Sequence, residues 1–276
     1  MIRPIKAIIM RNLMKFVRDR MRFFFTILMS GLFLFVFSFA TKSIGIALAH
    51  PMNYLISGII IMTVFQTSLN NSMNILEDIS TGFMKEILVA PIARWQIATG
   101  QIFSSTIIST LQGMIIIIVG LFIGLDVDLI HGILMIALMF LVGLTFSSLG
   151  LYLASVTKES TNYQLIVNLI VLPLTFLSGA YIPTMALPKM MAPIVYLNPL
   201  TYTTSAFRYI ALHMESLSPA ELVATGVAFD INGFIVTPTM GILMIIAMGA
   251  LFFTLCVKKF NDADFSRVKV FKRGHR

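Results

Sequence analysis

The stretch 74-NILEDISTGFMKEILVAPIARWQIATGQI-102 is a charged interruption in a chain that is otherwise strongly apolar. Of the 276 residues, 58% are hydrophobic and only 12% are charged, and the mean hydropathy is +0.92. Soluble domains carry about 25% charged residues, so this composition indicates an integral membrane protein. The charged residues, which give a net charge of +8, lie mainly at the ends of apolar runs. We therefore assign this charge to orientation and lipid headgroups, and we expect no nucleic-acid binding.

Apolar runs on both sides of this stretch are long enough to cross a bilayer. A hydrocarbon core of about 30 Å needs about 20 helical residues. None of the runs contains Asp, Glu, Lys or Arg. The sequence therefore predicts an all-α integral membrane protein with six transmembrane helices in one domain, 1–276. The predicted spans are Phe23–Thr41, Tyr54–Met73, Ile102–Ile123, Gly132–Val156, Leu165–Ile182 and Phe234–Val257.

The first run has a second interpretation, a secretory signal. Basic residues precede it, and Ala47-Leu48-Ala49 resembles a cleavage site. The apolar part of a signal typically has about 7 to 15 residues, and the run 23–41 is longer. We therefore expect a retained membrane anchor.

The basic residues predict the orientation. When successive connections are assigned to alternate sides, 17 of the 20 Lys and Arg residues fall on one side. Lys42, Lys189 and Arg208 fall on the other. The positive-inside rule places the larger group in the cytoplasm. We therefore expect a multi-pass protein of the cell membrane with both termini, the basic tail 258–276 and the opening stretch in the cytoplasm.

The segment 1–22 is predicted to be an amphipathic helix lying in the membrane interface. Its apolar residues recur at helical spacing and its basic residues form a separate stripe. Two roles stay open, anchoring to anionic lipid and binding a partner. The apolar positions are Ile5, Ile9, Leu13 and Phe16, and the basic ones are Arg11, Lys15, Arg18 and Arg22.

The opening stretch predicts a short amphipathic helix. Glu77 and Asp78 suit a helix N-terminus, Ile79, Phe83 and Ile87 share one face, and Pro91 ends the helix. An ordered helix with exposed apolar groups, followed by Arg94 and Trp95, indicates a docking surface. The alternative is an interfacial helix whose Trp95 belongs to an aromatic belt.

Between Ile182 and Phe234 lie five of the ten prolines, in a segment that begins apolar. It is too broken to span a membrane and too apolar for a free loop. We expect short outer re-entrant helices between spans five and six, in the region 183–233, with Asn198-Pro199 at a turn. A compact outer cap is the alternative.

Two separated segments resemble the membrane subunits of type 2 ABC transporters. The run 79-ISTGFMKEILVAPIARWQIATGQI-102 resembles the first cytoplasmic loop of this family. The run 168-NLIVLPLTFLSGAYIPTMALPKMMAPIVYLNPLTYTTSAFRYI-210 resembles its fifth span and outer re-entrant segment. The resemblance covers essentially the whole chain and is closest to the exporter branch for drugs, lipids and polysaccharides. The residues that match the re-entrant motif are Ser178, Gly179, Pro183, Asn198, Pro199 and Arg208.

The resemblance implies an exporter permease that works as a homodimer with two copies of a cytoplasmic ATPase. ATP and Mg would be bound by that partner, and the loop helix would couple the two proteins. The implied coupling residues are Glu77, Asp78, Gly82, Phe83, Ile87, Pro91, Arg94 and Trp95.

The residues themselves agree with a separate ATPase. No Gly-x-x-x-x-Gly-Lys-Ser/Thr phosphate loop occurs, since none of the 17 glycines precedes a Lys. We therefore expect this chain not to be an enzyme. The alternative function is an ion-coupled secondary transporter, which is disfavoured because the predicted spans lack ionisable residues.

Polar residues within the predicted spans are candidates for a substrate pathway. They are expected to face a passage, and interhelical hydrogen bonding is the alternative. The uncharged spans suit an amphiphilic drug, a lipid or a lipid-linked glycan. We expect no metal site and no cofactor bound by this chain, because no His pair has metal-ligand spacing. The candidate pathway residues are Gln66, Asn70, Ser105, Ser109, Asn168 and Thr175.

Overall fold

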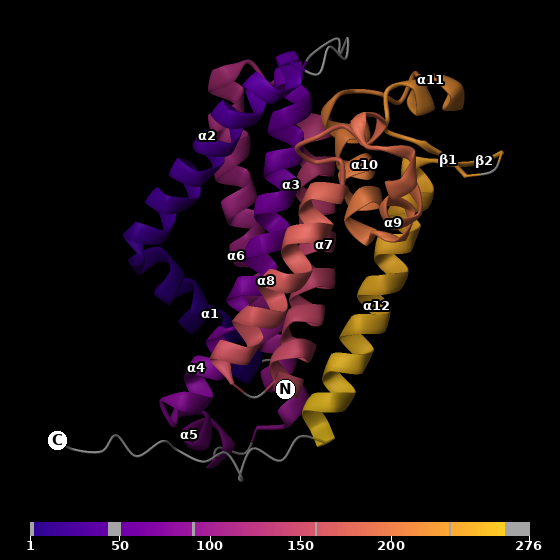
Figure 1. Ribbon diagram of the computed structural model, residues 1–276. Coiled ribbons are helices and arrows are strands. Elements are labelled where there is room, and N and C mark those ends of the chain that lie inside the picture. The colour runs from indigo at the N-terminus through magenta and orange to yellow at the C-terminus, as the bar shows by residue number, and fades with distance from the viewer. Residues whose placement is uncertain (1–2, 44–50, 90–91, 158, 232, 263–276) are drawn as a thin grey trace.

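The computed structural model describes residues 3–43, 51–89, 92–157, 159–231 and 233–262. Over this part of the chain almost all regular structure is helical (Figure 1). The α-helices are α1 Arg3–Arg18, α2 Arg20–Ser43, α3 Pro51–Asn71, α4 Asn74–Ser80, α5 Phe83–Val89, α6 Arg94–Ile123, α7 Leu129–Thr157, α8 Ser160–Leu177, α9 Ala192–Leu197, α10 Pro199–Ala211, α11 Pro219–Ala224 and α12 Pro238–Asp262. The 3-10 helices are η1 Thr184–Ala186 and η2 Lys189–Met191, and the strands are β1 Phe229–Ile231 and β2 Phe234–Val236.

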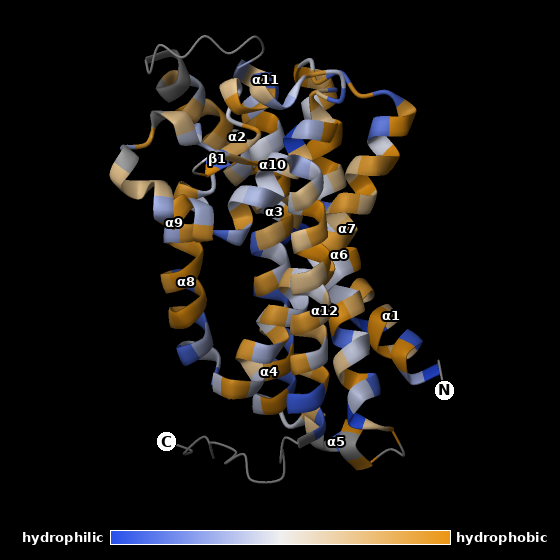
Figure 2. Ribbon diagram, turned by 90° about the vertical axis from the view of Figure 1, so that its right-hand side faces the viewer, coloured by the Kyte–Doolittle hydropathy of each residue, from blue (hydrophilic) through white to orange (hydrophobic). Residues whose placement is uncertain are grey.

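Six helices of the described chain are long and apolar enough to cross a membrane, α4 extending the second of them. Figure 2 shows hydrophobic residues running along these helices, with hydrophilic ones more frequent toward the two ends. The predicted all-α architecture with six apolar spans is confirmed.

Helix α3 is the centre of the bundle. It packs against α6 and α7, and α12 packs on the far side of α7. Ile60, Ile61 and Val64 of α3 are completely buried. Helix α2, in contrast, lies at the edge, where none of its described side chains is buried. Its partly buried side chains face α3 and α6, and the others point away from the bundle.

The helices meet closely where small residues face each other. A Cβ added at Gly143 of α7 would lie 2.8 Å from Ser109 Oγ of α6, and one at Gly150 would lie 2.6 Å from Ser72 Oγ. Ser147 Oγ donates a hydrogen bond of 2.9 Å to Ser105 Oγ. Small residues let helix backbones approach in this way in membranes.

The short helices and the hairpin lie toward the two ends of the bundle (Figure 1). One end carries α4, α5 and the last turn of α12, and we call it the α5 end. The other carries α11 and the β-hairpin, and we call it the α11 end.

The helices differ from the predicted spans at several boundaries, and three of these differences have a clear local cause. Helix α6 begins at Arg94 rather than Ile102, because the Gln96 side chain accepts a 3.0 Å hydrogen bond from the backbone N–H of Ala93 and caps the helix there. Helix α8 ends at Leu177 rather than Ile182, because Gly179 turns the chain with a φ of +79°.

The last span begins at Pro238 rather than Phe234, because Phe234–Val236 is a strand. It pairs antiparallel with Phe229–Ile231, and Gly233 in the turn has a φ of +86°. The sequence signal for this hairpin is Asn232-Gly233 between the apolar residues Ile231 and Phe234, which is a strong turn signal.

Candidate functional site

The charged interruption forms two helices at the α5 end rather than the single helix predicted. Gly82 separates α4 from α5 with a φ of +83°, a backbone conformation that residues with a side chain rarely adopt. Ile79 and Ile87 still pack against the core from the two helices, and Phe83 is half-buried. Pro91 lies outside the described residues.

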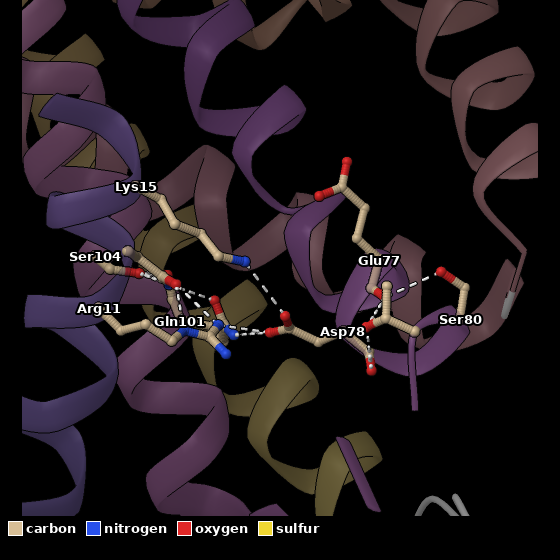
Figure 3. Close-up of polar contacts among 9 residues, drawn as sticks. Arg11, Lys15, Glu77, Asp78, Ser80, Gln101 and Ser104 are labelled. Atoms are coloured by element: carbon tan, nitrogen blue, oxygen red, sulfur yellow. Dashed lines mark hydrogen bonds and ion pairs between the residues drawn. The ribbon is translucent and has the colours of Figure 1, made fainter. Parts of the chain in front are cut away.

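Asp78 is the buried charge of this site. Its side chain is only 4% exposed, and its carboxylate accepts a 2.5 Å hydrogen bond from Arg11 Nη2. Lys15 Nζ lies 3.6 Å from the other carboxylate oxygen, and Gln101 Nε2 lies 3.4 Å from the first (Figure 3). Two basic residues of α1 thus neutralise one acid of α4.

The same network continues into α6. Asn12, which is buried between Ile8 and Phe16 on α1, accepts a 2.9 Å hydrogen bond from Arg11. Its amide donates to Gln101 Oε1 at 2.8 Å and to Ser104 Oγ at 2.7 Å. Charge-assisted and fully paired contacts of this kind fix the geometry of the groups that make them. The network therefore joins α1, α4 and α6 into one unit.

The outward side of α4 and α5 carries exposed groups of mixed character. Glu77 and Glu86 are exposed, and Val89, the last residue of α5, is 88% exposed. The Phe83 ring contacts the Arg11 guanidinium, whose central carbon lies 4.8 Å from the ring centroid. We call Glu77, Phe83, Glu86 and Val89 the α4–α5 surface.

Arg94 and Trp95 begin α6 next to this surface. Arg94 Nη1 donates a 3.0 Å hydrogen bond to the backbone carbonyl of Asn261, near the end of α12. Trp95 is half-buried. Arg94 thus ties the first turn of α6 to the last turn of α12.

A cavity of about 250 Å³ lies between α2 and α3. Gln66 and Asn70, two of the predicted pathway residues, both line it. We call it the α2–α3 cavity. Its lining combines aromatic and polar groups, with one cation and no acid: Arg22, Phe25, Thr26, Met29, Ser30, Phe33, Ile59, Thr63, Gln66, Thr67, Asn70, Gln112 and Tyr181.

Hydrogen bonds hold part of this lining in place. Gln112 Nε2 of α6 donates to Thr26 Oγ1 of α2 at 2.6 Å, and Arg22 donates to Asn71 Oδ1. Among the described residues, the buried Gln112 Oε1 has no hydrogen-bond partner. A buried acceptor left without a donor is costly, so this atom is suited to a donor on a bound molecule.

The other predicted pathway residues lie elsewhere. Ser105 Oγ donates to the Ser68 carbonyl at 3.1 Å, and Ser109 Oγ donates to the Thr106 carbonyl at 2.9 Å, so both are buried in helix packing. Asn168 is exposed on α8 and Thr175 is buried. Ser105 therefore makes an interhelical hydrogen bond, which was the alternative to a role in the substrate pathway.

The residues of the predicted re-entrant motif meet at the end of α8. Asn198 Nδ2 donates to the Leu174 carbonyl at 2.8 Å, while its side-chain oxygen accepts from the Leu200 N–H and caps α10. Pro199 occupies the first turn of α10, where its missing N–H costs nothing. Pro183 is buried, and Ser178 Oγ accepts from the Ala180 N–H at 3.2 Å.

Arg208 of α10 is buried in this same region, with 2% of its surface exposed. Its Nη2 donates to the Ala180 carbonyl at 2.8 Å, and its guanidinium carbon lies 3.4 Å from the centroid of the Tyr54 ring. A Cβ at Gly179 would lie 3.8 Å from Arg208 Nη1. Backbone carbonyls and an aromatic face stabilise this cation in place of an acid.

Comparison with known proteins identifies the family. The model of the ABC-2 type transporter family matches residues 3–212. The chain belongs to the ABC-2 type transporter family. It is a multi-pass membrane subunit of an ABC transporter, and subunits of this kind work with an ATP-binding subunit.

Relatives of this permease subunit occur in Cyanophora paradoxa, Porphyra purpurea and Escherichia coli. It is 26% identical over 209 residues to the putative transport permease ycf38 of Cyanophora paradoxa, covering 75% of this chain and 70% of the relative. It is 36% identical over 165 residues to ycf38 of Porphyra purpurea, covering 57% of this chain and 55% of the relative. It is 25% identical over 160 residues to the probable multidrug ABC transporter permease YbhR of Escherichia coli, covering 58% of this chain and 43% of the relative. The chain thus spans about half the length of two of these three relatives.

The sequence of this permease subunit did not predict three buried residues of the polar network: Asn12, Gln101 and Ser104. The position of Asn12 in the sequence does carry a signal for a buried polar contact. It occupies the position between Ile8 and Phe16 in a run with four-residue spacing, where an apolar residue is expected. A polar residue on the buried face of a helix indicates a partner across the interface.

Proposed function

We propose that this subunit exports an amphiphilic substrate across the cell membrane, driven by a separate ATPase that docks on the α4–α5 surface and binds ATP and Mg. The observation that carries this proposal is the Arg11–Asp78 pair. It connects an exposed surface at the α5 end to α1, which leads directly into α2, one wall of the α2–α3 cavity.

The mechanical path has three steps. A partner pressing on Val89 and Phe83 moves α5, and the short α4 moves with it through the turn at Gly82. Asp78 on α4 then pulls or pushes Arg11 and Lys15 on α1. Helix α1 continues into α2 with only Asp19 between them, so the movement changes the separation of α2 and α3. Such rigid-element motion is how packed helices transmit a small displacement.

The cavity lining supports the substrate class. Phe25, Phe33 and Tyr181 offer aromatic surface, while Gln66, Asn70 and Gln112 offer amides. This mixture suits a molecule with an apolar body and a polar head. Arg22 and the lack of an acid in the lining favour a neutral or anionic head over a cation. A drug, a lipid and a lipid-linked glycan all meet this description.

The orientation follows the charge distribution: the α5 end faces the cytoplasm, the α11 end faces outward, and both termini of the chain are cytoplasmic. The short helices α9 and α10 then dip into the outer leaflet as re-entrant helices. Their broken backbone is covered by protein contacts such as Asn198 to Leu174 and Arg208 to Ala180. Two copies of the subunit assemble with two ATPases.

Reconstituted vesicles with the cognate ATPase test the coupling. Phe83→Ala removes the ring that contacts Arg11 and lies on the α4–α5 surface, so we expect ATP hydrolysis to continue while transport per ATP falls by about tenfold, equivalent to about 1.4 kcal/mol of lost coupling. Phe122→Ala is the matched control, because Phe122 is 90% exposed at the other end of α6.

Normal transport in Phe83→Ala at normal expression would reject the α4–α5 surface as the coupling site. Transport that continues after ATP depletion and stops when the ion gradients are collapsed would reject the ATPase-driven function and establish ion coupling.

A further inference from the structure

At the α11 end, four side chains from two separate parts of the chain converge. Asp128 lies in the α6–α7 connection, and His131 lies in the first turn of α7. His213 and Glu215 follow the end of α10. The imidazole centroids of His131 and His213 lie 3.8 Å apart. One ligand atom each of Asp128, His131 and His213 falls within 4.8 Å of the others.

We propose that Asp128, His131 and His213 bind a divalent transition-metal ion, with zinc as the best match. Two imidazoles and a carboxylate are a ligand set that zinc and its neighbours prefer, with metal–ligand distances of about 2.0–2.2 Å. Rotation of these partly exposed side chains brings their ligand atoms to those distances. A water completes a four-coordinate shell.

The electrostatics of the cluster favour an ion. Each neutral imidazole offers a lone pair and Asp128 offers a negative carboxylate, so three acceptors lie side by side. Such groups repel one another unless a cation or protons lie between them. A proton on His131 would pair with Asp128 and Glu215 but not with His213, and protons on both rings would place two positive charges in contact. A single metal ion satisfies all three groups at once.

The surrounding contacts resemble the outer shell of a metal site. The Nε2 atom of His131 lies 3.1 Å from Glu215 Oε1, and the Nε2 atom of His213 lies 3.3 Å from the Asp126 carbonyl. A histidine that binds metal typically donates its other N–H to a carboxylate or carbonyl, which fixes the ring orientation. This leaves Nδ1 of each ring toward the ion: the Nδ1 atom of His131 contacts Asp128 Oδ1, and there the ion would replace the proton that the two groups otherwise share.

The backbone conformation of His213 determines where its side chain lies. Its φ is +53°, and it is the one non-glycine residue of the described chain with a positive φ. This conformation turns the imidazole back toward α7 after α10 ends. The histidines are distant in the sequence, which explains why ligand spacing predicted no metal site. The ion would join the α6–α7 connection to the α10–α11 loop.

The site is separate from the transport function proposed above, and with the proposed orientation it faces the external medium. Side-chain exposures of 50% for Asp128 and 19% for His131 leave a route for the ion. The site therefore does not depend on the ATPase, and its test needs only the purified chain.

The test measures zinc binding by competition with a chromophoric chelator, using full-length protein in detergent that carries no polyhistidine tag. We expect one zinc per chain. His131→Ala and His213→Ala should abolish this binding, and Glu215→Gln should weaken it about 10- to 100-fold, as loss of an outer-shell partner does. Asp230→Asn is the matched control, because this exposed carboxylate lies in the hairpin at the same end and outside the cluster.

Cobalt provides a second measurement that needs no variant. Co²⁺ in the wild-type protein should show the intense visible absorption of a four-coordinate site, which zinc displaces. Zinc binding no tighter in the wild type than in the His131→Ala, His213→Ala double variant would overturn the proposal. So would the lack of the cobalt spectrum in folded wild-type protein.

Discussion

Asp78 and Glu77 are adjacent acids in opposite surroundings. Asp78 is buried against Arg11, while Glu77 points outward, as Figure 3 shows. A buried carboxylate requires a paired cation, because removing either partner leaves the other charge without compensation. A carboxylate in water is stabilised by hydration and requires no paired cation. The two positions therefore provide a direct measure of what the Arg11–Asp78 pair contributes.

We expect Asp78→Asn to lower the free energy of unfolding by about 1–3 kcal/mol, the range for a lost charge-assisted hydrogen bond. Arg11 is 22% exposed, so solvent screening keeps the loss below that of a fully buried pair. Denaturant unfolding in detergent checks this. Glu77→Gln is the control and should change stability by less than about 0.5 kcal/mol.

A double-mutant cycle with Arg11→Gln isolates the pair. If Asp78 and Arg11 act together, the double variant should lose less than the sum of the single losses. Additive losses would show that the two side chains stabilise the protein independently.

Gly58 marks a close approach of a helix to a turn. A Cβ at this position of α3 would lie 2.2 Å from the Ala180 carbonyl oxygen, which accepts the Arg208 hydrogen bond. Gly58→Ala must displace backbone, and we expect a loss of about 1–3 kcal/mol in the free energy of unfolding. Gly31→Ala on α2 is the matched control, since no atom lies within 4 Å of its added Cβ. Equal stability of the two variants would mean that the turn at Ala180 yields easily.

At the scale of the element, α5 is a short helix with an exposed apolar tip. Val89 is 88% exposed at the end of the bundle that carries the α4–α5 surface. An apolar residue at the centre of a docking patch contributes about 1–2 kcal/mol to binding, which corresponds to a 5- to 30-fold change in affinity. We expect Val89→Ser to weaken ATPase binding by this factor while leaving the unfolding midpoint unchanged.

Surface-immobilised permease with the ATPase in solution measures this affinity. Leu129→Ser is the control, because Leu129 is 81% exposed at the start of α7, toward the α11 end. Unchanged affinity in Val89→Ser, with Leu129→Ser also unchanged, would place the ATPase contact elsewhere.

The elements divide into those that the sequence predicts and those that depend on tertiary structure. Long apolar runs without charges predicted the six spans, since the bilayer fixes their length. The break at Gly82 does not follow from the sequence, because a glycine inside a helical pattern is compatible with both a continuous helix and a break. The turn signal Asn232-Gly233 is local, but the apolar residues Phe234–Val236 also continue the last apolar run, so the predicted span began four residues before the helix.

The functional contacts were less predictable than the spans. Arg11 and Asp78 are 67 residues apart, and neither position alone indicates its partner. Gln66 and Asn70 line the cavity, but Ser105 and Ser109, chosen by the same polar criterion, pack between helices. Spacing along one helix identifies a polar face, and only the neighbouring helices determine whether that face meets a cavity or another helix.

At the scale of the whole molecule, the α2–α3 cavity is the proposed passage. We expect Gln66→Leu to raise the KM for transport by about tenfold, because about 1.4 kcal/mol is the order of one lost hydrogen bond to substrate. ATPase binding should not change. Asn168→Leu, the same kind of substitution at an exposed position of α8, should have little effect. Equal effects at both positions would argue against this cavity as the passage.

The assembly itself gives the final prediction. One chain offers one α4–α5 surface, and α2 exposes apolar side chains such as Phe35 at 65% and Phe39 at 56%. Exposed apolar surface on this scale faces lipid or a second copy. Native mass spectrometry of the complex, extracted gently from its host membrane, should therefore find two permease chains with two ATPases. A lone chain or a homo-oligomer without ATPase, found in several mild detergents, would contradict the docking role of the α4–α5 surface. It would also favour a transporter that draws on ion gradients.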